Sequence, residues 1–174
     1  MARIPMVDYD KLSPEAKAEY TNQIKKHGRI TNMKKTLLND VLSFKVLMEW
    51  YPLRDKAAEF LGDFGVNVFC HAISSYNNCL ICSTFFRKLL KDEGINPDKL
   101  KLDDRLQTLV DYGTACVNQP TVISDELFAR LKKHFSDKQI VILTAFAGMM
   151  IATNLINNAL EVELDDYLTS YTKR

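Results

Sequence analysis

The residues best suited to do chemistry are two cysteines, Cys79 and Cys82, which stand three positions apart. Residues at this spacing share one face of a helix, so the two sulfurs can reach disulfide distance with little backbone movement. A helix that begins at Cys79 also turns unpaired N–H groups and the positive end of its dipole toward that sulfur, which favours the reactive thiolate. The pair is therefore either a redox-active dithiol or two buried cysteines that act as small apolar residues.

A candidate proton carrier, His71, precedes this pair. His71 follows Asn67 by four residues and Asp63 by eight, so a helix would place all three on one face. The short link from Ser74 to Asn78 suggests that this helix packs beside the cysteine helix, where His71 could serve a thiol as base or proton shuttle. The alternative is a partly buried histidine that hydrogen-bonds a backbone carbonyl.

The remaining cysteines and histidines do not suggest a cofactor. One CxxC pair and three histidines are too few for a structural zinc site, which needs four ligands. Cys70 and Cys116 have no partner pattern and are expected in the core. His27 and His134 lie near expected helix C-termini, where a positive charge is favourable, and are expected to act as caps. We expect no metal and no cofactor.

The composition is that of a soluble globular protein, and 174 residues are enough for one domain over 1–174. Hydrophobic residues make up 47% and charged residues 26%, which excludes a disordered chain. Lys and Arg number 23 against 22 Asp and Glu, so there is no basic excess for a nucleic-acid partner. No stretch reaches the roughly 18 apolar residues of a membrane span. The N-terminus lacks a secretory apolar region, so a cytoplasmic protein is expected.

Apolar residues recur at helical spacing throughout, and the turn residues fall mostly between these segments, which predicts an all-α fold. We expect helices over 14–27, 32–51 (as one or two), 53–72, 79–93, 104–117, 125–134 and 137–160. Pro52 should break the chain, whereas Gly62 and Gly65 should weaken their helix without ending it. Ser136 and Gln139 form a capping box ahead of the last helix. That helix is apolar nearly all round, as in a buried central helix or one at a subunit interface.

Three stretches of the sequence are similar to one known family. The chain resembles the CxxC-containing, AhpD-like branch of the carboxymuconolactone decarboxylase family. The resemblance covers nearly the whole chain in the expected order: an entry segment over 3–5, 12–15 and 28–33, the NNCLIC motif over 77–82, and a C-terminal part over 122–131, 135–146 (FSDKQIVILTAF) and 154–160.

This resemblance implies a compact all-helical fold, an AhpD-like multi-helix bundle that assembles into homo-oligomers. The activity it implies is that of a thiol peroxidase. Cys82 would attack a hydroperoxide and become a sulfenic acid, and Cys79 would resolve that acid to a disulfide. A lipoyl or thioredoxin-like protein would then act as the dithiol reductant.

The sequence departs from the family at the proton relay. Asn67 stands where peroxidase members carry Glu, Phe86 stands where they carry His, and Ile81 stands where some place another His. His71 is the nearby replacement, and loss of a general base costs about 10²–10⁴ in rate, so a slow peroxidase is expected. Two alternatives stay open: a non-catalytic oligomeric binding or scaffold protein, and a lactone decarboxylase, for which no Arg is obviously placed to bind a carboxylate.

Overall fold

The computed structural model describes residues 2–118 and 121–173, and this part of the chain contains helices and no strand. The predicted all-α class is confirmed. In chain order the elements are η1 (Tyr9–Lys11), α1 (Pro14–His27), α2 (Asn32–Leu37), α3 (Val41–Met48), α4 (Trp50–Tyr76), α5 (Leu80–Asp92), α6 (Asp104–Ala115), α7 (Asp125–His134), α8 (Asp137–Ala159) and η2 (Asp166–Tyr171), where η marks a 3-10 helix.

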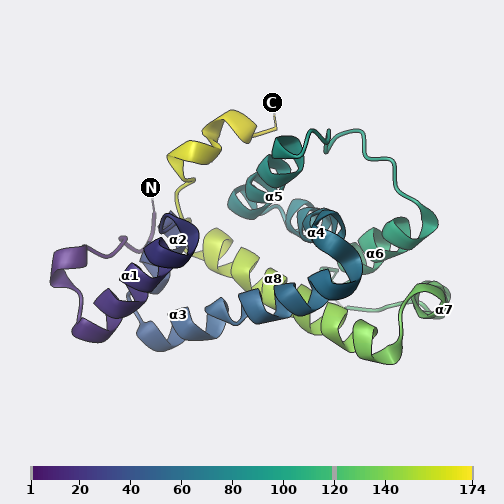
Figure 1. The fold of residues 1–174 in the computed structure, drawn as a ribbon, viewed down its shortest axis with the longest axis horizontal. Helices are drawn as coiled ribbons and strands as arrows, with labels where there is room; N and C mark the ends of the chain where they lie inside the picture. The colour runs from purple at the N-terminus through teal and green to yellow at the C-terminus, as the bar shows by residue number, and fades with distance from the viewer. Residues whose placement is uncertain (1, 119–120, 174) are drawn as a thin grey trace.

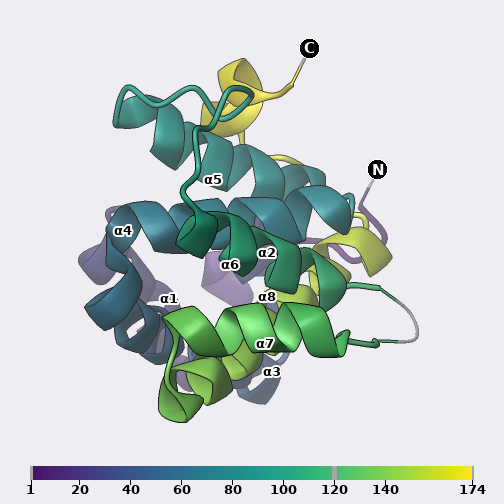
Figure 2. The same ribbon diagram turned by 90° about the vertical axis from the view of Figure 1, so that its right-hand side faces the viewer.

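Helices α4 and α8 form the centre of the molecule (Figure 1). Their contact is filled by large side chains that are almost entirely buried, among them Phe69 and Ile73 of α4 and Leu143 and Phe146 of α8. Helices α5 and α6 also pack against α4. Figure 2, in which the molecule is turned by 90°, shows α7 beside α6. Helices α1 to α3 lie at the opposite end of the molecule from α7 (Figure 1) and enclose a smaller apolar cluster around Phe44.

Helix α8 is buried along one side only. Its exposed side carries Val141 and Leu155, which are 69% and 62% exposed. Contrary to the expectation from the sequence, α8 is long and apolar enough to cross a membrane by length and composition, and it is the one such helix in the described residues. The core helix of a soluble protein passes the same test. Leu143 and Phe146 of α8 pack into the core against α4, and 39% of the apolar window is buried.

The predicted break at Pro52 is wrong, and the interruption lies ten residues later. Pro52 is the third residue of α4. Backbone N–H groups in the first turn of a helix have no intrahelical acceptor, so the N–H that proline lacks costs little here. At Gly62 the backbone leaves the helix (φ 68°, ψ 171°) and α4 kinks, contrary to the expectation that this glycine only weakens the helix. Glycine adopts this conformation readily because it has no Cβ.

Side-chain caps mark the starts of α1, α6, α7 and α8. Ser13, Asp103, Ser124 and Ser136 each accept a hydrogen bond from a backbone N–H of the first turn, and Ser136 with Gln139 completes the predicted capping box. These caps explain why the boundaries of α1, α6, α7 and α8 lie close to the predicted ones.

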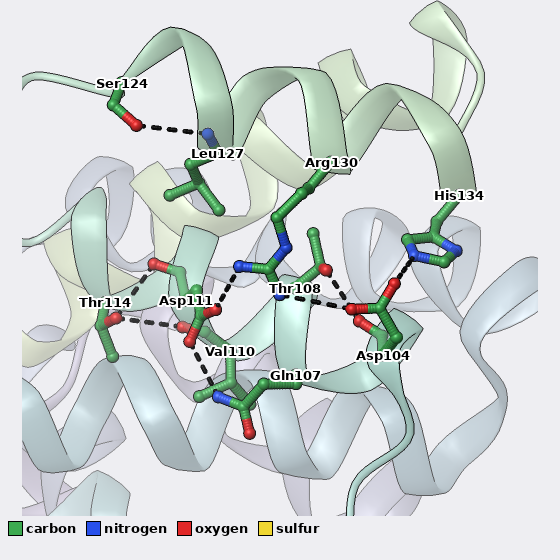
Figure 3. A network of polar contacts seen from close by, with 10 residues as sticks. All are labelled: Asp104, Gln107, Thr108, Val110, Asp111, Thr114, Ser124, Leu127, Arg130 and His134. Atoms are coloured by element: carbon green, nitrogen blue, oxygen red, sulfur yellow. Dashed lines mark hydrogen bonds and ion pairs between the residues drawn. The ribbon is translucent and has the colours of Figure 1, made fainter.

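A polar network joins α6 to α7 (Figure 3). Arg130 of α7 lies between two carboxylates of α6, 2.9 Å from Asp111 and 3.5 Å from Asp104. His134 is the last residue of α7, as predicted, but its ring pairs with Asp104 at 2.8 Å and not with a helix carbonyl. Exposed ion pairs of this kind contribute little stability each, so the network chiefly orients α7 on α6.

The close contact of α6 with α4 at Gly113 provides a test of the fold. A Cβ added at Gly113 of α6 would lie 2.7 Å from the Phe69 ring and 3.0 Å from Ile73. Gly→Ala in a helix normally stabilises by about 1 kcal/mol, but overpacking costs about 1–3 kcal/mol, so we expect Gly113→Ala to lower the free energy of unfolding in urea. Gly148→Ala is the matched control, because nothing lies within 4 Å of its added Cβ, and it should raise stability. Equal stabilisation by both variants would contradict the close crossing.

Candidate functional site

The two cysteines lie at the start of α5, where the sequence predicts them. Asn78 adopts a left-handed backbone (φ 51°), which turns the chain sharply from the end of α4 into α5. The Cys79 N–H donates to the carbonyl of Ser74 at 2.9 Å and fixes this turn. Cys79 is then the N-cap residue of α5 and is fully buried, whereas Cys82, in the first turn, is 6% exposed.

An amide from α8 reaches both sulfurs. Asn157 Nδ2 donates to Cys82 Sγ at 3.1 Å and lies 3.8 Å from Cys79 Sγ. One turn earlier, the buried Asn154 donates to Ser74 Oγ at 3.3 Å and accepts from Asn77 Nδ2 at 3.3 Å. These two amides hold the cysteine turn against the central helix. An N–H directed at a sulfur also favours the thiolate over the thiol.

Proton sharing gives the two thiols opposite tendencies. The hydrogen bond from the Cys82 thiol lowers the pKa of Cys79. Asn157 and the backbone N–H groups of the first turn of α5 lower it further, although the Cys79 side chain makes no capping hydrogen bond. The same hydrogen bond and burial raise the pKa of Cys82. The loss of one proton from the pair is therefore favoured, and the loss of the second is disfavoured.

A cavity of about 390 Å³ opens beside Cys82, and Cys79 does not line it. This volume is in the range of small-molecule sites in proteins, about 300–1,000 Å³. Much of its wall is apolar: Met33, Leu47, Met48, Trp50, Ile81, Phe85, Phe86, Met150 and Leu168. Ile81 and Phe86, the residues that depart from the family's relay, are thus parts of the cavity wall. Only Cys82 of the pair can meet a molecule bound there.

A buried lysine lines the same cavity. Lys34 of α2 donates to Gln23 Oε1 at 2.6 Å and to Tyr51 Oη at 2.7 Å. Burial lowers the pKa of Lys34 to about 8 and raises the pKa of Tyr51 to about 12. Sequence reasoning missed both Lys34 and Asn157. The signal for Asn157 was present, because Asn154, Asn157 and Asn158 interrupt an otherwise apolar helix; the signal for Lys34 was not.

The structure does not bring His71 to the sulfurs. His71 lines a second cavity, of about 430 Å³, on the side of α4 that faces α6. Burial, followed by the nearby Arg87 guanidinium, lowers the pKa of His71. Asn67 is buried in α4 and lines neither cavity. The roles of His71 as base and of Asn67 as support remain predictions, and this geometry adds nothing in their favour.

The other predicted core cysteines lie apart from the site, Cys70 fully buried and Cys116 partly buried. No cluster of His, Cys, Asp and Glu that could hold a metal ion occurs within 2–118 and 121–173.

The Asn157 contact generates a prediction about thiolate formation. Replacing Asn157 by Leu keeps the branched shape and the number of side-chain heavy atoms but removes the N–H donor. A hydrogen bond to a charged group contributes about 1.5–3 kcal/mol, so the titration midpoint of the pair should rise by about 1–2 pH units. Thiolate absorbance near 240 nm, followed against pH, measures it. Asn158→Leu is the control, because Asn158 donates to the Asn77 carbonyl and not to a sulfur. An unchanged midpoint in Asn157→Leu would contradict the assigned role.

Solved structures of the same architecture cover almost the whole chain. A peroxidase-related protein from Ralstonia eutropha JMP134, described as an alkylhydroperoxidase AhpD core, is 16% identical with a TM-score of 0.77 over 96% of this chain and 94% of that one. A peroxidase-related protein from Silicibacter sp. TM1040 is 20% identical with a TM-score of 0.73 over 95% and 91%. The debrominase Bmp8 is 13% identical with a TM-score of 0.79 over 97% and 95%, and a variant of it has been solved with 2,3,4-tribromopyrrole.

No family model and no curated protein matches the sequence. The structural likeness nevertheless extends over all the helices that build the site, and the fold expected from the sequence motifs is confirmed. The chain has the AhpD-like fold.

Proposed function

We propose that this protein is a thiol-dependent oxidoreductase that reduces organic hydroperoxides with the Cys79–Cys82 dithiol. The observation that carries the proposal is the position of Cys82. Cys82 lines a cavity of small-molecule size, and its sulfur accepts a hydrogen bond from Asn157 and lies beside a second thiol that can resolve it. The names of two structural neighbours, both peroxidase-related proteins, agree with this proposal.

The reaction balances with these two sulfurs and one reductant. The Cys82 thiolate attacks the terminal oxygen of the hydroperoxide, the O–O bond breaks, and Cys82 becomes a sulfenic acid. The proton shared by the pair passes from Cys79 to the departing alkoxide, which leaves as an alcohol. The Cys79 thiolate then attacks Cys82 Sγ, the disulfide forms, and hydroxide leaves and takes a proton to become water. A dithiol reductant restores the pair.

Asn157 has a second polar atom available for this step. Its Oδ1 is buried with no hydrogen-bond partner in the protein, and Asn157 lines the cavity. A hydroperoxide that donated its O–H there would place its terminal oxygen close to the sulfur that Nδ2 contacts. Among the residues that line this cavity, Asp165 carries a carboxylate and His27 an imidazole, and neither hydrogen-bonds a cysteine. We therefore expect a slow enzyme, since an absent general base costs about 10²–10⁴ in rate.

Peroxide titration followed by peptide mass spectrometry tests the proposal. One equivalent of cumene hydroperoxide should convert Cys79 and Cys82 to a disulfide that dithiothreitol reverses. Cys79→Ser should stop at a sulfenic acid on Cys82 that dimedone traps, and Cys82→Ser should abolish peroxide consumption. Cys116→Ser, at a partly buried cysteine outside the cavity, is the matched control and should leave the reaction unchanged. Thiols that stay reduced and label only after denaturation would instead indicate a non-catalytic binding or scaffold protein.

A second candidate function is reductive dehalogenation of a small aromatic ring. The apolar and aromatic walls around Cys82 favour it, together with the likeness to a debrominase whose complex contains a brominated pyrrole. The balance is simple: the dithiol is oxidised to the disulfide, the C–Br bond is replaced by C–H, and bromide and one proton are released. Bromide release from a brominated pyrrole, measured with the same variants, separates this activity from peroxide reduction.

We also infer that the chain forms a homo-oligomer through the exposed side of α8. The exposed Val141 and Leu155 support this, because large apolar side chains gain free energy when an interface removes them from water. The double variant Val141→Glu with Leu155→Glu should lower the mass measured by light scattering to that of one chain, 19.9 kDa. An unchanged mass in a folded variant, or a wild-type protein that is already monomeric, would refute this interface.

A further inference from the structure

The ammonium of Lys34 is a buried cation with neutral partners. Lys34 is 5% exposed, and its Nζ contacts the Gln23 amide oxygen and the Tyr51 hydroxyl. The carboxylate of Asp165 acts on the charge of Lys34, but the two form no salt bridge in the part of the chain that the structure describes. Buried charges in proteins are nearly always paired, because removing an ion from water is costly. Lys34 therefore has unused capacity to hold an anion in the cavity that it lines.

The charges around the cavity agree with this. Three cationic residues line it, Arg29, Lys34 and Lys88, against the single carboxylate of Asp165. Lys88 is already paired with Asp92 on its own helix. Asp165 accepts a hydrogen bond from the Asn32 N–H, and its other oxygen is buried without a partner. The remaining positive charge favours an anionic group on a bound molecule.

Further unpartnered atoms mark the cavity as a binding site. Trp50 Nε1 and Asn157 Oδ1 are buried without hydrogen-bond partners in the protein, and both residues line this cavity. An unpaired buried donor or acceptor carries the full cost of its lost hydration, so proteins rarely keep one without use. Trp50 can donate to an oxygen of a bound molecule, and Asn157 can accept from its O–H. The apolar wall formed by Met33, Met48 and Phe85 fits a hydrocarbon body between them.

From these features we propose that the cavity selects an amphipathic organic acid: a hydroperoxide with a compact apolar or aromatic body and a carboxylate that pairs with Lys34. This inference rests on the proposed function for the hydroperoxide group and on Lys34 for the acid group. Lys34 is a specificity-determining residue in this proposal. It binds the far end of the substrate and leaves the sulfur chemistry to Cys82 and Cys79.

Binding of the reaction products tests the acid preference without any turnover. The probes are 2-phenylpropan-2-ol, the alcohol from cumene hydroperoxide, and its para-carboxylate, which differ only in the acid group. Trp50 is the single tryptophan of the chain and lines the cavity, so its fluorescence reports occupancy. We expect the carboxylate to bind about 10- to 100-fold more tightly than the neutral alcohol, as for other charge-assisted contacts. Equal affinities in the wild-type protein would overturn the proposal.

Variants of Lys34 assign the preference to this residue. Lys34→Met should abolish the difference between the two probes, and Lys34→Arg should retain most of it. Lys56→Met, at an exposed lysine paired with Glu59, is the matched control and should behave as wild type. If Lys34→Met fails to fold by circular dichroism, Lys34→Arg and the wild-type comparison decide. A preference that survives in folded Lys34→Met would refute the role of Lys34. Tight binding of the carboxylate by a protein that consumes no peroxide would refute the proposed peroxidase activity but not the proposed acid-binding site.

Discussion

The packing of α8 against α4 is the contact on which the site depends. Through Phe146 and Phe69 it forms the centre of the core, and it sets the distance from which Asn154 and Asn157 reach the cysteine turn. The sulfurs themselves belong to α5, which leaves α4 through a tight turn that Asn78 makes possible with a left-handed backbone. A shift of α8 by even part of a helical turn would remove the amide from both sulfurs. Core packing and thiol chemistry are therefore coupled through one helix.

Two thiols and one amide produce an asymmetry that neither cysteine has alone. Cys79 holds charge more easily because Cys82 donates to it, yet it is sealed from the cavity. Cys82 meets the cavity but keeps its proton more tightly. Moving the shared proton from one sulfur to the other exchanges these roles. In the proposed reaction, the thiolate forms at Cys82 when the proton lies on Cys79, where it is also available to the leaving group.

Local signals in the sequence predict much of the fold and half of the site. The caps at Ser13, Ser124 and Ser136 and the position of Cys79 at a helix start follow from rules that act within a few residues. The error at Pro52 has a local cause too, because a proline in the first turn of a helix breaks nothing. Asn157 stands out locally as a polar residue in an apolar helix, but local rules could not assign its partner. It meets Cys82 across 75 residues of chain, and only the tertiary packing brings them together. Proximity along the chain likewise suggested His71, which the helix turns toward a different cavity.

The kink at Gly62 divides α4 into two pieces with separate tasks. The piece before it supplies Trp50 and Tyr51 to the cavity wall, and the piece after it carries the core contact with α8 and the turn into Cys79. Because the backbone is not continuously helical between them, a change in the wall need not be transmitted as a rigid-body movement of the sulfurs. A substitution that reshapes the wall at Trp50 or Tyr51 can therefore change what the cavity admits without displacing the turn that carries Cys79.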